Sequence, residues 1–296
     1  MNSKSSKENV KVGLIQMASV EDPASNLQEA ERGIRQASAR GAQIISLQEL
    51  FQTEYFCQVE DHEYFKLAEA IPGASTEKMS QLARELEVVL IVPLFEKRSS
   101  GIYHNTAVVI DADGSVAGKY RKMHIPDDPG FYEKFYFTPG DTGFQAIHTR
   151  YGKVGVLICW DQWFPEAARL TALSGAQILF YPTAIGYQEF DTAVAPKQIE
   201  AWQTIQKAHS IANGVFTAVT NRVGPENNIK FWGQSFISDP FGEIIAQASS
   251  EEPEILVADC NLALIEETRQ GWPFLRDRRV DAYQNLSRLY IDSNDT

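Results

Sequence analysis

The sequence predicts a single α/β domain built from two similar halves. Apolar runs rich in Val and Ile alternate with segments whose apolar residues recur at helical spacing, a pattern typical of strands alternating with helices. Similar segments also recur in the same order in the two halves of the chain. No linker rich in Pro, Gly or Ser separates the halves, so we expect them to share one core.

The internal repeat rests on three pairs of segments. Strand–turn–strand segments of α/β proteins can resemble one another by chance, but three matches in the same order favour a duplication. The matched pairs are VGLIQ with VGVLIC, starting at Val12 and Val154; GAQIISLQEL with GAQILFYPTA, starting at Gly41 and Gly175; and VVIDADGSVAG with SFISDPFGEIIA, around Gly114 and Gly242.

The first half is expected to run strand, helix, strand, helix, strand and to end in a hairpin. Its strand segments are nearly continuous apolar runs, as in strands that are buried on both faces. Gly41 ends the first helix, Thr76 can cap the second, and Asp113–Gly114 is a turn pair typical of hairpins. The expected elements are strands at 11–18, 42–50 and 88–96, helices at 26–41 and 76–87, and a hairpin over 105–120.

The second half repeats this order after a long irregular segment, residues 121–141. Pro165 marks the start of its first helix, because proline is favoured in the first turn. We expect residues 1–10 to be disordered and residues 11–296 to form one domain with a C-terminal extension from about residue 272. The expected elements are strands at 153–159, 176–184, 214–221, 232–239, 243–249 and 254–260, and helices at 165–175 and 198–213.

Composition argues against several kinds of partner and cofactor. The formal net charge of −12 disfavours nucleic acid. The three cysteines are far apart, the five histidines are scattered, and no phosphate-binding glycine motif is present, so we expect no disulfide framework, metal ion or nucleotide cofactor. The N-terminus lacks the apolar core of a signal peptide, and no apolar run reaches the roughly 18 residues of a membrane span. We therefore expect a cytoplasmic protein without membrane contacts.

Three reactive side chains lie at the ends of predicted strands or just after them. Cys159 ends the strand at 153–159, Glu49 lies at the end of the strand at 42–50, and Lys122 follows the hairpin. Reactive groups of α/β proteins gather where strands end and helices begin, and exposed backbone N–H groups there would stabilise a Cys159 thiolate. Each residue also has an ordinary alternative. Cys159 could be an inert core thiol, Glu49 a solvated residue at a strand end, and Lys122 a surface charge. Spacing alone does not join the three residues.

Three separated blocks resemble a known family. LQELFQTEYF, YRKMHIPDDPGFYEKFYF and GVLICWDQWFPEAARL resemble the signature blocks of the nitrilase superfamily of carbon–nitrogen hydrolases, and the likeness runs from about Val12 to Tyr290. This resemblance implies a four-layer α-β-β-α sandwich with an internal pseudo-two-fold repeat, which agrees with the repeat described above. It also implies assembly into a homo-oligomer.

The resemblance further implies hydrolysis of a small amide or urea through a thioester. Cys159 would be the nucleophile, and Glu49 would transfer the protons. Lys122 and the backbone N–H of Trp160 would stabilise the oxyanion. Glu133, in the middle block, would orient Lys122 or hydrogen-bond the substrate.

The substrate pocket is expected to be aromatic and acidic. No arginine follows Cys159 until Arg169, which disfavours a substrate carrying a carboxylate. The segments YFCQ, PTAIG and FLRDRR resemble family members whose substrate has a carbamoyl group at one end and a cationic group at the other. Glu189, or otherwise Asp191, would bind the cationic end. The residues expected to bind substrate are Tyr55, Phe131, Trp160, Trp163, Ala184 and Glu189.

Other interpretations stay open on the sequence alone. An omega-amide of a dicarboxylic acid would need a cationic side chain, for which Arg222 and Arg276 are candidates. A true nitrilase activity is possible on the same catalytic residues, but the second block of this sequence is less similar to that of true nitrilases. A non-enzymatic binding protein is disfavoured because all three reactive residues are present. The stretch from Trp272 to Tyr290 either crosses an oligomer interface or straps its own subunit.

Overall fold

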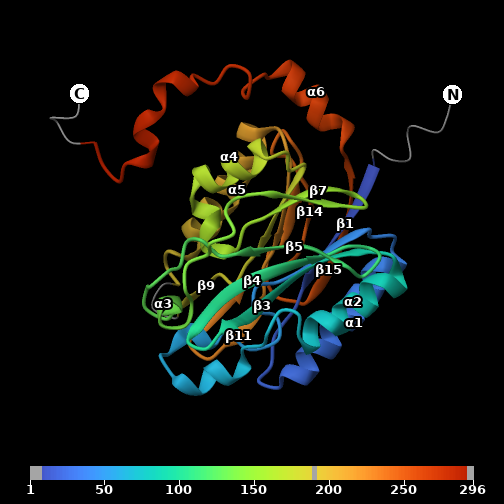
Figure 1. Ribbon diagram of the computed structural model, residues 1–296, viewed down its shortest axis with the longest axis vertical. Coiled ribbons are helices and arrows are strands. Elements are labelled where there is room, and N and C mark those ends of the chain that lie inside the picture. The colour runs from blue at the N-terminus through green and yellow to red at the C-terminus, as the bar shows by residue number, and fades with distance from the viewer. Residues whose placement is uncertain (1–8, 189–191, 292–296) are drawn as a thin grey trace.

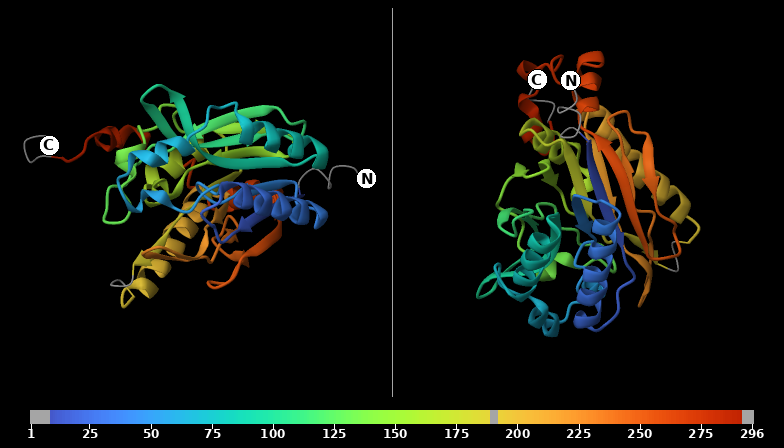
Figure 2. Two further views of the ribbon diagram at one scale, coloured as in Figure 1. Left: turned by 90° about the horizontal axis from the view of Figure 1, so that it is seen from below. Right: turned by 90° about the vertical axis from the view of Figure 1, so that its right-hand side faces the viewer.

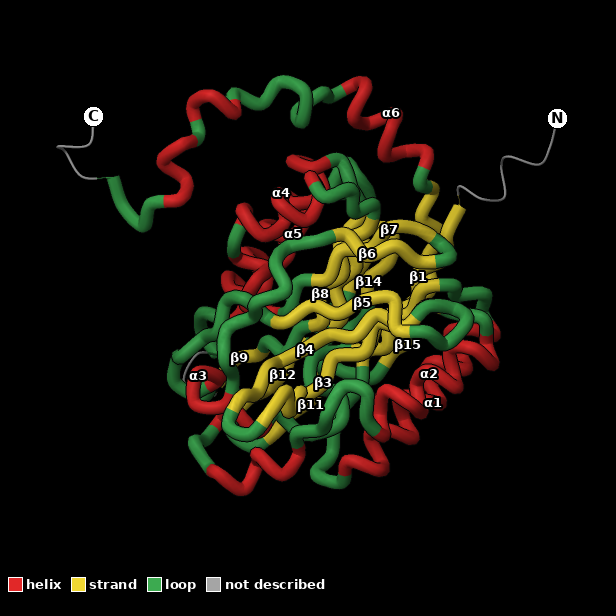
Figure 3. Tube along the Cα trace, viewed as in Figure 1, coloured by secondary structure: helices red, strands yellow, loops and turns green. Residues whose placement is uncertain are grey.

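The structure, a computed structural model, describes residues 9–188 and 192–291. Two six-stranded sheets face each other at the centre of the domain, and helices cover the outer face of each sheet (Figure 1, Figure 2). The strands lie in the middle of the molecule with the helices around them (Figure 3). This is the four-layer α-β-β-α arrangement, so the predicted fold class is confirmed.

The first sheet has the strand order β15-β1-β2-β3-β4-β5, with β1, β2 and β3 parallel and the other neighbours antiparallel. Along β1, Val12 and Leu14 pack in the core shared with the second sheet, whereas Ile15 packs against the outer helices. Burial of both faces explains why the strand is apolar almost throughout. The strands are β1 (Asn9–Gln16), β2 (Ile44–Leu47), β3 (Val89–Ser99), β4 (Ile102–Ile110), β5 (Val116–Arg121) and β15 (Glu254–Asn261).

The second sheet has the order β14-β13-β10-β8-β7-β6. Strands β7, β8 and β10 are parallel, and the strands outside them are antiparallel to their neighbours. Its strands are β6 (Ala146–Thr149), β7 (Gly152–Val156), β8 (Ile178–Pro182), β10 (Phe216–Thr220), β13 (Phe236–Ser238) and β14 (Ile244–Gln247).

The topology contains the internal repeat that the sequence predicts. Read from β6 to β14, the second sheet has the same pattern of parallel and antiparallel neighbours as the first sheet read from β15 to β5. Even the hairpin turns match: the N–H of Gly114 donates to the Asp111 carbonyl at 2.8 Å, and that of Gly242 to the Asp239 carbonyl at 2.9 Å. Both glycines have a left-handed φ, of 82° and 78°, which glycine adopts at low cost.

Two helices cover each sheet. Helices α1 and α2 pack on the first sheet, and α4 and α5 lie over the second. Helix α1 begins at Pro23, three residues before its predicted start, because the Asp22 side chain caps the N–H groups of Ala24 and Ser25. The helices are α1 (Pro23–Ala39), α2 (Ala74–Leu86), α3 (Glu133–Tyr136), α4 (Pro165–Leu173), α5 (Ala195–Asn213) and α6 (Ala263–Gly271).

Two of the predicted strands end three residues before their expected ends. Strand β2 stops at Leu47 and β7 at Val156. Just beyond them, Leu50 and Cys159 have φ angles of 48° and 45°, which lie outside the extended region that a strand requires. Both predictions therefore extended the strand into a turn.

A small third sheet was not predicted. Its strand order is β11-β12-β9. Trp232, the first residue of the segment expected to be one strand over 232–239, belongs to this sheet. That segment bends because Gly233 and Gln234 have φ angles of 58° and 55°. Its strands are β9 (Gly186–Gln188), β11 (Val223–Glu226) and β12 (Ile229–Trp232).

The two ends of the described chain lie near one end of the sandwich (Figure 1). Strand β1 begins at Asn9, so two of the ten residues predicted to be disordered belong to a strand, and residues 1–8 lie outside the described part. Beyond α6, residues 272–291 leave the body of the domain and contain the short 3-10 helices η5 (Val280–Ala282) and η6 (Gln284–Ser287). Within residues 9–188 and 192–291, no helix is long and apolar enough to span a membrane.

Candidate active site

The four residues of the expected catalytic set converge from four parts of the chain. Glu49 lies just beyond β2, and Lys122 directly follows β5. Glu133 is the first residue of α3, and Cys159 begins the 3-10 helix η3 (Cys159–Trp163) after β7. All four side chains are buried. Glu49, Lys122 and Glu133 are in direct contact with one another through the lysine.

Lys122 joins the two glutamates. Its Nζ donates to Glu49 Oε1 at 2.8 Å and to Glu133 Oε2 at 2.6 Å. Asn105 Nδ2 also donates to Glu49 Oε1, at 2.7 Å, and the Tyr55 hydroxyl donates to Glu133 Oε1 at 2.7 Å. Within the described residues, Glu49 Oε2 has no hydrogen-bond partner. One carboxylate oxygen is therefore available to accept a proton.

Burial and the charges within the cluster, which holds two carboxyl groups for one ammonium group, together shift its pKa values. Burial raises the pKa of Glu133 to about 7, although the charge of Lys122 opposes the rise. Burial alone would lower the pKa of Lys122, but the charges of Glu133 and Glu49 raise it well above its ordinary value. Lys122 is therefore a permanent cation at neutral pH.

Cys159 is presented on a strained turn at the bottom of a cavity. Its φ of 45° is unusual for a residue other than glycine, and such strain costs of order 1–3 kcal/mol and concentrates at functional sites. Its Sγ lies 3.7 Å from the Ala184 carbonyl oxygen. Burial, and then the charge of Glu49, raise the pKa of the Cys159 thiol well above its ordinary value. A neutral resting thiol follows, which agrees with the expectation that Glu49 takes the thiol proton.

A buried carboxylate, Asp161, supports this turn. Asp161 Oδ2 accepts from the Ile158 N–H at 2.9 Å and from the Tyr120 hydroxyl at 2.8 Å. Its Oδ1 accepts from the backbone N–H of His124 at 3.0 Å and lies 2.7 Å from the His124 ring Nδ1. The His124 ring also stacks on Phe164, with centroids 3.7 Å apart. His124 therefore has a structural role beside this turn.

A second buried network supports Glu49 through its backbone. Arg222 Nη2 donates to the carbonyl oxygens of Glu49 and Leu50 at 2.7 and 3.1 Å, and Nη1 contacts Glu226 Oε2 at 2.8 Å. Glu226 Oε2 in turn accepts from the Tyr55 N–H at 2.6 Å. The suggestion that Arg222 binds a substrate carboxylate is wrong, because the guanidinium is fully buried and paired. Arg276, the other candidate, is exposed and paired with Asp277.

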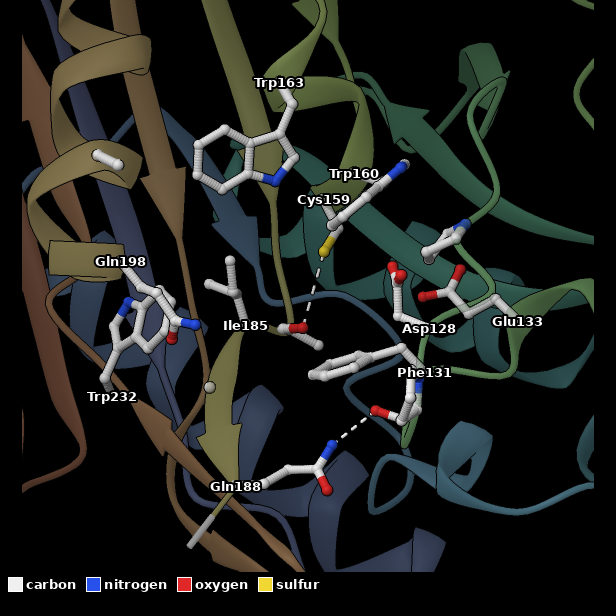
Figure 4. A pocket seen from close by; sticks show the side chains of 15 residues that line it. Asp128, Phe131, Glu133, Cys159, Trp160, Trp163, Ile185, Gln188, Gln198 and Trp232 are labelled. Atoms are coloured by element: carbon white, nitrogen blue, oxygen red, sulfur yellow. Dashed lines mark hydrogen bonds between the residues drawn. The ribbon is translucent and has the colours of Figure 1, made fainter. Parts of the chain in front are cut away.

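The cavity above Cys159 has a volume of about 430 Å³ (Figure 4). Four of the predicted substrate-binding residues line it: Phe131, Trp160, Trp163 and Ala184. The indoles of Trp160 and Trp163 meet edge to face, with centroids 6.5 Å apart. The other lining residues include Asp128, Ile185, Gln188, Gln198 and Trp232.

The predicted pocket residue Tyr55 has a different place in the structure. Tyr55 is not among the residues that line the cavity; it is fully buried behind the site, and its hydroxyl is taken by Glu133. The prediction for Tyr55 is corrected accordingly, from substrate contact to support of Glu133. Glu189 and its alternative Asp191 lie outside the described residues, which stop at Gln188 before them.

Sequence reasoning assigned no role in this site to Asn105, Asp161 and Glu226, and it considered Arg222 only as a partner for a substrate carboxylate. Their partners are distant in the chain, as with the 173 residues that separate Arg222 from Glu49. The available signal was a charged residue close to large apolar ones, such as Asp161 between Trp160 and Trp163, because buried charges need partners. That signal indicates burial but does not identify the partner.

Comparisons with known proteins identify the family of the chain. The carbon–nitrogen hydrolase family model matches residues 11–270. N-carbamoylputrescine amidase of Solanum lycopersicum is 46% identical over 289 residues, covering 95% of both chains. Citrullinase of Francisella tularensis is 42% identical over 287 residues, covering 95% of this chain and 99% of the other. A crystal structure of a carbon–nitrogen hydrolase from Helicobacter pylori has 48% identity and a TM-score of 0.93, covering 96% of this chain and 100% of that one.

The family match extends over most of the chain, and the fold and the repeat agree with it. The protein therefore belongs to the carbon–nitrogen hydrolase family and is an enzyme that hydrolyses carbon–nitrogen bonds other than peptide bonds.

Proposed function

We propose that the enzyme hydrolyses N-carbamoylputrescine to putrescine, ammonia and carbon dioxide through a thioester on Cys159. The observation that carries this proposal is the cluster of Glu49, Lys122 and Glu133 next to a buried cysteine at the base of an aromatic cavity. The similarity to plant N-carbamoylputrescine amidases over nearly the whole chain supports the choice of substrate.

In the first half of the reaction, the thiol of Cys159 attacks the carbamoyl carbon. Glu49 takes the thiol proton, which suits a resting thiol and a carboxylate with one unpaired oxygen. Lys122 and the Trp160 N–H stabilise the oxyanion of the tetrahedral intermediate. Glu49 then returns the proton to the departing ammonia, leaving a carbamoyl thioester on Cys159.

In the second half, water hydrolyses the thioester. Glu49 deprotonates the water as it attacks the thioester carbon, and Lys122 again stabilises the oxyanion. When the carbon–sulfur bond breaks, Glu49 returns this proton to the sulfur of Cys159. The carbamic acid released from Cys159 loses carbon dioxide and yields the free diamine, so one water is consumed for each ammonia and carbon dioxide formed. Glu133 does not react in this scheme; it holds the Lys122 ammonium in place at 2.6 Å.

The lining of the cavity favours a substrate whose far end is cationic. Among the described lining residues there is no Arg, Lys or His, and the walls are largely aromatic. Two carboxylates line it, and Glu133 is occupied by Lys122 and Tyr55. Asp128 is the other: within the described part of the chain its side chain has no ion pair, and in Figure 4 it points into the cavity. An ammonium group could pair with it, whereas the carboxylate of citrulline or of an omega-amide would find no cation.

The test is ammonia release from three substrates that share a urea end. N-carbamoylputrescine carries a distal ammonium, citrulline adds a carboxylate, and N-butylurea is neutral. We expect kcat/KM for N-carbamoylputrescine to exceed both others by at least about tenfold, the value of one charge-assisted hydrogen bond. A preference for citrulline would reject the proposed substrate and leave the family assignment intact.

Neighbouring aspartates provide a matched pair of variants for the same assay. Asp127 and Asp128 are both exposed, but only Asp128 is among the lining residues. Asp128→Asn should raise KM for N-carbamoylputrescine about tenfold and leave N-butylurea unchanged, whereas Asp127→Asn should change neither. Equal effects on both substrates would remove Asp128 from ammonium recognition.

We also propose a cytoplasmic homo-oligomer in which residues 272–291 contact a second subunit. This segment exposes large apolar side chains, with Leu286 64% and Tyr290 77% accessible, more than a monomer surface usually presents on one short stretch. We expect light scattering after gel filtration to give at least a dimer, and removal of residues 280–296 to reduce the assembly. An unchanged mass after the truncation would assign the segment to its own subunit.

A further inference from the structure

We propose that Asp161 is a positioning residue that fixes Cys159 and Lys122 relative to each other. The inference rests on the proposed function for the roles of these two residues, but not on the identity of the substrate. Asp161 is fully buried and takes no part in the reaction described above. Its partners lie on the two segments that carry the nucleophile and the oxyanion-binding lysine.

The contacts of Asp161 surround Lys122 in sequence. The Tyr120 hydroxyl, two residues before Lys122, donates to Oδ2 at 2.8 Å. The backbone and ring of His124, two residues after Lys122, contact Oδ1 at 3.0 and 2.7 Å. One carboxylate therefore ties down the chain on both sides of the lysine.

The same carboxylate holds the turn of the nucleophile. The N–H of Ile158, the residue before Cys159, donates to Oδ2 at 2.9 Å, and the Asp161 N–H donates to the Ile158 carbonyl at 3.1 Å. These two bonds close the turn in which Cys159 has its φ of 45°. Without them the strained residue would relax toward a common conformation and its Sγ would move away from the oxyanion site.

Only an ionised carboxylate suits all of these contacts. Four donors meet the two oxygens of Asp161, two at each oxygen. An asparagine keeps two acceptor positions but places an NH₂ group against two of the donors. Asp161→Asn therefore preserves the volume while it breaks the link at one oxygen. Because catalysis depends strongly on sub-ångström alignment, the loss should appear in the chemical step.

The experiment measures alkylation of Cys159 by iodoacetamide, located by peptide mass mapping, together with steady-state kinetics. For Asp161→Asn we expect at least a thirtyfold fall in kcat, less than a threefold change in KM, and a changed alkylation rate with a shifted pH profile. Tyr120→Phe, which removes one of the four donors, should change the same quantities in the same direction by a smaller factor. If Asp161→Asn fails to fold, Tyr120→Phe carries the test.

Thr217→Val is the control for a general loss of stability. Thr217 lies in β10, is fully buried, and shares hydrogen bonds with Ser210 and Ser238 at 3.1 and 2.6 Å, away from the site. It should lower the melting temperature and leave kcat and alkylation unchanged. An Asp161→Asn or Tyr120→Phe protein with wild-type alkylation and kcat would overturn the proposal. Altered alkylation in an enzyme that does not hydrolyse N-carbamoylputrescine would reject only the substrate.

Discussion

Replacing Cys159 with alanine is expected to lower kcat by at least about 10⁴-fold, because removal of a covalent nucleophile leaves only binding and oxyanion stabilisation. The fold should survive, since the hydrogen bond from the sulfur to the Ala184 carbonyl is long, at 3.7 Å, and alanine is no more strained than cysteine at this backbone angle. Ammonia release measures the activity, and circular dichroism with thermal melting measures the fold. Cys260→Ala is the matched control, because this thiol is equally buried but lies in β15, away from the cavity.

Glu49→Gln should have an effect of similar size for a different reason. The amide can still accept the hydrogen bonds from Lys122 and Asn105, so the local geometry is retained. It cannot accept the thiol proton, and the resting thiol then stays protonated and unreactive. Activity above about one per cent in either the Cys159 or the Glu49 variant is incompatible with the proposed reaction, because Cys159 is the only thiol among the described lining residues and the proton transfers are assigned to Glu49 alone.

The fold could be predicted because its strongest signals are local. Buried parallel strands read as apolar runs, and the repeat places the same strand, helix and turn signals in the same order twice. The predictions failed where one residue redirects the chain, as at Leu50, Cys159 and Gln234, whose positive φ angles end strands or divide them. Such angles are imposed by tertiary contacts, and the residue types carry no sign of them.

The site was predictable only in part. Glu49, Lys122, Glu133 and Cys159 came from the resemblance of three blocks to a family, and the residues alone did not join them. The structure shows why: their contacts cross sequence separations such as the 73 residues between Lys122 and Glu49. Tyr55 was placed in the pocket because it lies in the first of the three blocks, in the segment YFCQ, yet its hydroxyl donates to Glu133. Side-chain direction depends on packing that periodicity does not encode.

Replacing Lys122 with methionine should damage both catalysis and stability. Loss of one oxyanion donor typically lowers kcat about 10²–10³-fold. The change also leaves Glu49 and Glu133 facing each other in the interior without a cation, and removal of one partner of a buried ion pair costs about 3–5 kcal/mol of unfolding free energy. Lys119→Met is the matched control: its ammonium is partly exposed and pairs with Glu96, so its loss should cost about 1 kcal/mol or less.

The stability loss of Lys122→Met should depend on pH in a defined direction. Lys122 lowers the pKa of Glu133, which burial holds at about 7, so removing the lysine raises that pKa further. A carboxyl group with a higher pKa in the folded state than in the unfolded state binds its proton more tightly when folded. Stability is therefore retained at low pH and lost as pH rises. Urea unfolding should show a larger deficit in unfolding free energy at pH 8 than at pH 5.5, and an equal deficit at both would mean that Lys122 does not lower the pKa of Glu133.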